Sequence, residues 1–148
     1  MKENKKIKIG CASAFWGDTN DAAAQLVKSN ELNYLVFDYL AEVTMSILAA
    51  SQMKNPDLGY ATDFISQTGP LLSEIKAQGI KVISNAGGIN PIACRKALIK
   101  EADKQGLDFK IAIVEGDNLF HQKDNFSKKR VKDIDLSLIH ISEPTRPL

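Results

Sequence analysis

The sequence has little cysteine and little histidine, and it has no long hydrophobic run. Cys11 and Cys94 lie far apart and fit neither a disulfide framework nor the spacing of zinc ligands. No apolar stretch reaches the length of a signal peptide or of a membrane span. We therefore expect a cytoplasmic protein with no membrane partner.

An excess of charge of either sign is also missing. The 19 Lys and Arg residues are balanced by 18 Asp and Glu residues, for a net charge of +1. Proteins that bind nucleic acid or anionic membranes concentrate positive charge, so no nucleic acid is expected as a partner. The composition, 44% hydrophobic and 25% charged, is typical of an ordinary globular domain.

Short apolar, β-rich runs alternate with segments of helical periodicity along the chain. This alternation favours an α/β fold, an open, mostly parallel sheet of about four strands with helices on both faces, Rossmann-like and three-layered. The predicted strands are residues 7–11, 32–38, 80–84 and 109–114. A helix is predicted over 43–53, because Val43, Ile47, Ala50 and Met53 recur at helical spacing. Another begins at Pro91, with Asn90 as its cap and Gly106 at its end.

The last part of the sequence departs from this pattern. Residues 120–135 are polar, and the stretch that begins at Leu136 is similar to the translation of an adapter used in sequencing libraries. We therefore predict a domain over 1–135 and a non-native tail over 136–148, in which His140 carries no function. We further expect that the fold is incomplete on its carboxy-terminal side. The missing carboxy-terminal part of the same chain would then be a partner, and self-association as a homo-oligomer would bury the apolar surface left open.

Candidate functional residues follow the predicted strands. Ligands of parallel α/β sheets bind at the carboxyl ends of the strands, where loops and helix amino-termini converge. The polar and glycine residues at these ends are Ser13 and Asp18, Asp38 and Glu42, Asn85, Gly87, Gly88 and Asn90, and Glu115, Asp117 and Asn118. Turn formation and helix capping explain such residues equally well, above all Asp18 and Asn90.

The segment from Asn85 to Pro91 is the sharpest local motif. Two adjacent glycines let backbone N–H groups approach a ligand, and the following helix start favours an anion. We predict that Ser13, Asn85, Gly87, Gly88 and Asn90 contact an anionic small molecule. On this hypothesis Gly88→Val lowers ligand affinity at little cost in stability.

Carboxylates supply the candidate chemistry. Asp38, Glu115 and Asp117 are the predicted catalytic residues, either as general acid or base or, together with Glu42, as ligands of Mg²⁺ or another divalent cation. Glu115 and Asp117 project to the same side if the chain stays extended past Gly116. Cys11 and Cys94 are expected to be structural rather than nucleophilic, because no histidine is visibly paired with either.

Four of these segments, residues 9–18, 35–42, 85–91 and 114–118, together resemble the amino-terminal domain of the acyclic terpene utilisation family. The resemblance covers about residues 7–118. It implies a role in the bacterial degradation of acyclic terpenoids such as citronellol and geraniol through CoA thioesters, and it implies no particular reaction.

Two function classes fit these observations. One is a catabolic enzyme that acts on a carboxylated or CoA-linked acyclic substrate. The other is a non-catalytic subunit that binds a small anion or assembles with a partner enzyme.

Overall fold

A computed structural model describes residues 6–122, 124 and 125. The chain divides into two units, Met1–Val114 and Glu115–Leu148. The elements of the first unit are β1 (Ile9–Ser13), α1 (Ala22–Lys28), β2 (Tyr34–Phe37), α2 (Glu42–Lys54), α3 (Thr62–Thr68), the 3-10 turn η1 (Gly69–Leu71), α4 (Leu72–Gln78), β3 (Lys81–Ser84) and α5 (Pro91–Lys104). In the second unit the structure assigns the 3-10 turn η2 (Phe120–Gln122).

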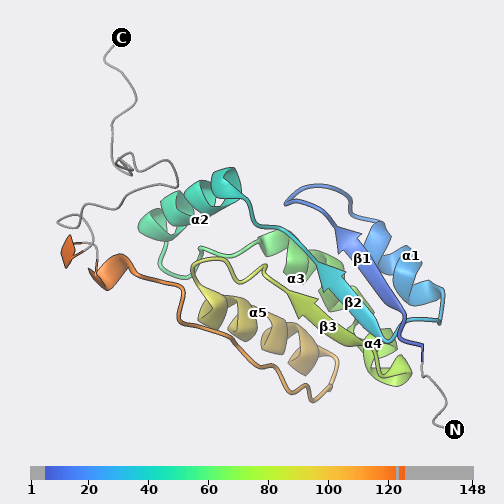
Figure 1. Ribbon diagram of the computed structural model, residues 1–148. Coiled ribbons are helices and arrows are strands. Elements are labelled where there is room, and N and C mark those ends of the chain that lie inside the picture. The colour runs from blue at the N-terminus through green and yellow to red at the C-terminus, as the bar shows by residue number, and fades with distance from the viewer. Residues whose placement is uncertain (1–5, 123, 126–148) are drawn as a thin grey trace, which may run out of the picture. The chain divides into compact units, whose positions relative to one another are not determined.

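An open parallel sheet forms the centre of the first unit (Figure 1). Its three described strands lie in the order β1-β2-β3, so β2 pairs with both neighbours. Leu35 lies between Gly10 on one side and Val82 on the other. The predicted α/β architecture with a parallel sheet is therefore confirmed, with three described strands in place of about four.

The predicted fourth strand over 109–114 is wrong: the structure assigns no strand there. The segment alternates as a strand does, with Phe109, Ile111 and Ile113 half-buried between exposed neighbours. However, its backbone is held by side chains and not by β3. Lys76 Nζ donates to Asp108 O at 2.9 Å, and Arg95 Nε donates to Ile111 O at 3.1 Å. Among the described residues, β3 therefore pairs with β2 alone.

A single core lies on one face of the sheet. Leu35 and Phe37 of β2 face this core, together with Val27 of α1, Phe64 of α3 and Ile75 of α4. Successive strand residues point to opposite faces, and the alternate ones are exposed, Ile9 to 65% and Ile83 to 55%. The other face of the described sheet is thus partly open at these positions, in keeping with the predicted α/β layout being incomplete.

The helix that follows β3 is built as its sequence predicts. Pro91 occupies the first turn of α5, and the Asn90 side chain accepts a hydrogen bond from Ala93 N at 3.2 Å. Cys94 and Ala102 are buried on its inner side. At its end Gly106 has φ +64 and its N–H donates to Asp103 O, as expected of a glycine that terminates a helix.

Helix α2 turns its apolar stripe outward. Val43 is 70% exposed, and Ile47 and Met53 are exposed as well, whereas Thr44 and Leu48 are the buried residues. The helix forms as predicted. However, the apolar residues whose spacing predicts it face solvent, and other residues of the helix pack against the core.

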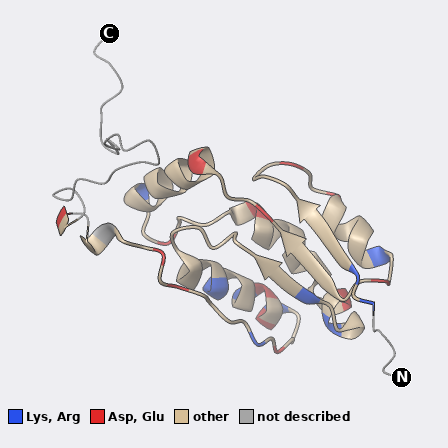
Figure 2. Ribbon diagram, viewed as in Figure 1, with Lys and Arg blue, Asp and Glu red and all other residues tan. Residues whose placement is uncertain are grey.

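Charged residues are distributed without a face of one sign in the view of Figure 2, and Lys, Arg, Asp and Glu all occur on α5. Among the described helices, none has the length and apolar composition needed to cross a membrane.

Candidate functional site

The loops that follow β1, β2 and β3 lie at one edge of the sheet, because the three strands are parallel. Side chains tie these loops together. Ser13 Oγ donates to Asp38 O at 3.3 Å, and Asn85 Nδ2 donates to Asp38 Oδ1 at 2.7 Å. The structure thus brings together Ser13, Asp38 and Asn85, one predicted site residue from each strand end.

Asn85 holds this edge in place with both ends of its amide. While its Nδ2 donates to Asp38, its Oδ1 accepts the backbone N–H of Tyr39 at 2.8 Å. The Asp38 side chain is exposed, so its carboxylate is both oriented by an amide donor and open to a ligand. A carboxylate in this setting is suited to accept a hydrogen bond from a ligand.

Sequence reasoning missed Tyr39, which lies beneath this edge. Its ring is fully buried against Phe37 and Phe64, and its hydroxyl contacts Gln67 Oε1 at 3.2 Å. Burial raises the pKa of Tyr39 to about 12, so the phenol stays protonated and acts as a hydrogen-bond donor. The sequence feature that could have indicated Tyr39 is its place directly after Asp38, the carboxylate at the end of the strand.

The glycine-rich turn is closed by its own hydrogen bonds. The N–H groups of Gly88, Ile89 and Asn90 donate to Asn85 O, Gly59 O and Gly87 O respectively. Gly88 has φ +52, and a Cβ on it would overlap Leu48 Cδ1 and lie 2.8 Å from Gly59 O. The turn packs against α2 and the loop before α3, and this packing accounts for Gly88 without a ligand.

Gly87 and Asn90 have equally definite local roles. A Cβ on Gly87 would lie 2.9 Å from the Cβ of Pro91. The Asn90 side chain caps α5 and also donates to Pro56 O at 2.9 Å and to Leu58 O at 2.8 Å. The capping explanation foreseen for Asn90 therefore holds, and anion binding by these residues stays a prediction.

The predicted carboxylates are distributed over both units. Asp38 and Glu42 belong to the first unit, whereas Glu115 and Asp117 belong to the second. Gly116 has φ +127, so the chain does not continue as a regular strand between Glu115 and Asp117. Within residues 6–122, 124 and 125, no three His, Cys, Asp or Glu side chains form a group that could hold a metal ion.

The cysteines differ in their surroundings. Cys11 is exposed, and its thiol donates to Ser13 O at 3.1 Å. Cys94 is buried on α5, and this burial raises the pKa of its thiol to about 11. A protonated buried thiol is a poor nucleophile.

A family model described as "Acyclic terpene utilisation family protein AtuA" matches residues 7–146, nearly the whole chain. The chain therefore belongs to the acyclic terpene utilisation (AtuA) family. The match extends past Leu136, into the segment for which a foreign origin is predicted. That segment lies outside the described residues. No curated protein and no solved structure gives a significant match to the chain.

Proposed function

We propose that this AtuA-family protein is a cytoplasmic catabolic enzyme that acts on a carboxylated or CoA-linked acyclic terpenoid. The family match supports the pathway. The observation that carries the site is the hydrogen bond of 2.7 Å between Asn85 and Asp38, which orients an exposed carboxylate at the edge where parallel α/β sheets bind their ligands. In this proposal Asp38 transfers a proton and Ser13 and Asn85 maintain its position.

The test is turnover of citronellyl-CoA and geranyl-CoA, and of the corresponding free acids, by the purified protein with and without Mg²⁺. Product formation is followed by mass spectrometry. Asp38→Asn preserves the size and the hydrogen-bonding shape of the side chain but removes its basicity, so we expect it to lower turnover by about 10²-fold or more. The matched control is Asp103→Asn, an exposed position on α5, which should leave turnover unchanged.

Activity equal to wild type in Asp38→Asn would contradict the role of Asp38. Absence of turnover with every CoA ester and acid would favour the second candidate, a non-catalytic assembly subunit. The open sheet face, with Ile9, Cys11 and Ile83 exposed, and the outward apolar stripe of α2 support that candidate, since surfaces of this kind bind proteins.

A further inference from the structure

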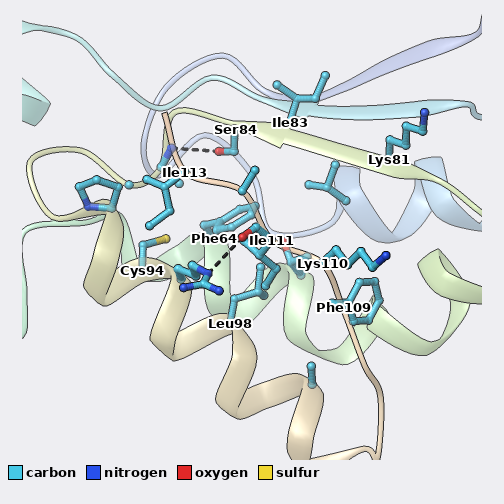
Figure 3. Close-up of a pocket in the computed structure, with 18 of the residues that line it drawn as sticks. Phe64, Lys81, Ile83, Ser84, Cys94, Leu98, Phe109, Lys110, Ile111 and Ile113 are labelled. Atoms are coloured by element: carbon cyan, nitrogen blue, oxygen red, sulfur yellow. Dashed lines mark hydrogen bonds between the residues drawn. The ribbon is translucent and has the colours of Figure 1, made fainter. Parts of the chain in front are cut away.

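An apolar groove of about 590 Å³ separates β3 from residues 109–114, which follow α5 (Figure 3). Residues 80–84 line one wall of this groove and residues 109–114 line another, with Cys94 and Leu98 of α5 between them. Among the described strands, β2 is the one partner of β3. The free edge of β3 therefore faces the groove and the segment beyond it.

This edge carries backbone groups that no described strand pairs. The Lys81 N–H donates to Asn33 O at 3.0 Å, on the side of β2. Successive residues of a parallel strand direct their backbone groups to opposite neighbours, so Val82 and Ser84 direct theirs toward the groove. Backbone N–H and C=O groups beside apolar side chains are costly until they are paired.

Residues 109–114 alternate in burial in step with β3. Their odd-numbered members are half-buried and their even-numbered members exposed, whereas on β3 the even-numbered residues are half-buried. In Figure 3 the segment runs in the direction of β3, with Lys110 toward the Lys81 end and Ile113 toward the Ser84 end. This alignment places Ile111 opposite Val82, and it places the next half-buried pair opposite each other on the same side of the sheet.

A contact from α5 determines which backbone groups of the segment are available. Arg95 Nε donates to Ile111 O at 3.1 Å, as the dashed line in Figure 3 shows. In an extended segment successive residues direct their backbone groups to opposite sides, so Ala112 directs its N–H and C=O away from Arg95. A parallel strand in this alignment bonds the Ala112 N–H to Val82 O and the Ser84 N–H to Ala112 O. The contact with Arg95 is compatible with that pairing.

Two lysines oppose the approach of the segment to β3. The same alignment places Lys110 opposite Lys81, and both side chains are exposed and line the groove. No Asp or Glu lines the groove to compensate them. Like charges directly opposite each other on neighbouring strands destabilise the pairing, and salt screens such exposed charges.

We propose that residues 109–114 are a strap that closes onto β3 as a fourth parallel strand. In the closed state Ala112 pairs with Val82 and Ser84, and the side chains of Ile111 and Ile113 fill the groove. The described structure is the open state, in which the β3 edge is accessible to another strand. The strap thus guards this edge, and the two lysines make its closure depend on salt. This switch is independent of the proposed reaction at the strand ends.

Residue-resolved hydrogen exchange of the full chain, followed by NMR, tests the proposal. Closure protects the amides of Val82 and Ser84, which face the strap, together with those of Ala112 and Val114. The Lys81 amide, which is bonded on the side of β2, is the internal reference. Raising NaCl from about 10 mM to about 1 M shortens the Debye length from ~30 Å to ~3 Å. It should slow exchange at the four amides by about threefold or more, relative to the reference.

Two variants should shift the equilibrium in opposite directions. Lys110→Glu replaces a like-charge pair with an opposite-charge pair, so exchange at Val82 and Ser84 should slow by about fivefold or more at low salt. Ala112→Pro removes an N–H that the closed state needs, so the same amides should exchange faster and lose their response to salt. The control Lys100→Glu makes the same charge change at an exposed position of α5 outside the groove and should alter neither rate.

Exchange at Val82 and Ser84 that responds neither to salt nor to Lys110→Glu would overturn the proposal, because the strap would then not reach β3. Protection of the strap equal to that of β2 under every condition would contradict it as well, because residues 109–114 would then be a permanent strand without an open state. Full protection retained in Ala112→Pro would count against the strap in a third way, since a second copy at the same edge would then be the source of the protection.

Discussion

At the scale of single residues, the predicted catalytic and ligand-binding residues at the ends of β1, β2 and β3 all have a local structural role, and two of them, Asp38 and Asn85, are also exposed. Asn85 illustrates this best, because its amide joins the ends of two strands through Asp38 and Tyr39. A ligand role for Asp38 therefore depends on a scaffold that the same loops provide. Substitutions in this region need controls that separate stability from chemistry.

Gly88 is required for the packing of its turn, so the expectation from the sequence that Gly88→Val costs little stability is wrong. Gly88→Val places a branched side chain at φ +52 and against Leu48 and Gly59 O, so backbone strain and overpacking add to about 2–5 kcal/mol of lost stability. The control is Gly17→Val at φ +89, where a Cβ meets nothing within 4 Å and only strain is expected. Urea denaturation measures both. Equal midpoints for the two variants would show that the turn after β3 is not packed as described.

The Cys94 thiol is predicted to make stability depend on pH under alkaline conditions. Burial raises its pKa from the ordinary value of 9.0 to about 11 in the folded protein. The unfolded state therefore releases the proton first, and the stabilisation is complete below pH 9.0 and is lost as the pH rises toward 11. The loss should be on the order of 2 kcal/mol.

Denaturant midpoints between pH 7 and pH 10.5 measure this effect. Cys94→Ala should flatten the alkaline decline relative to wild type, whereas Cys11→Ala, at an exposed thiol, should leave it unchanged. A decline of equal slope in all three proteins would assign the effect to other groups.

At the scale of elements, the sequence predicts what local chemistry determines. The capping Asn90 and Pro91 place α5 correctly, and apolar β-rich runs place β1, β2 and β3 within a few residues. Residues 109–114 have the same composition but no assigned strand pairing, because pairing depends on an edge that lies far away in the sequence. Periodicity cannot supply that information.

Helix α2 shows a second limit of periodicity. An apolar stripe at helical spacing normally faces a core, yet Val43 and Ile47 are exposed, while Leu48 packs against the turn at Gly88. The site shows the same limit. The sequence predicts that Ser13, Asp38 and Asn85 lie at one edge of the sheet, but it does not predict the strand order that brings them into contact. The closure of the glycine turn by Gly59 likewise depends on tertiary contacts.

The two sides of α2 should respond differently to substitution. Leu48→Ala removes a fully buried side chain and should lower stability by about 2–5 kcal/mol. Ile47→Gln changes an exposed position and should alter stability by less than about 0.5 kcal/mol. Urea denaturation compares them. A large loss in Ile47→Gln would mean that the stripe is covered, for example by a second copy.

At the scale of the whole molecule, the tail over 136–148 is expected to add nothing to stability. A segment without an evolved packing partner stabilises no core, so its deletion should leave the melting temperature unchanged within about a degree. Calorimetry on the full chain and on the chain ending at residue 135 provides the comparison. A fall of several degrees would assign the segment to the AtuA fold, in line with a family match that reaches residue 146.

The open face of the sheet affects how the whole molecule behaves in solution. Parallel sheets are normally covered on both faces, but here Ile9 and Ile83 are exposed on the outer two strands, and β3 has no described strand at its far side. We expect the protein to associate through this surface. Ile83→Lys places a charge on the open face at the edge strand, where lysine opposes edge-to-edge pairing.

Sedimentation velocity over a range of concentrations measures the association. Ile83→Lys should shift the protein toward a slower, concentration-independent species, with little change in unfolding free energy because no buried contact is lost. Met53→Lys is the matched control, since Met53 is 89% exposed on α2 and lies outside the sheet. If Ile83→Lys sediments as wild type does while Met53→Lys becomes monomeric, association uses α2 and the sheet face is not the interface. If all three proteins are monomers at every concentration, the open face is stable in water without a partner, and the expected association does not occur.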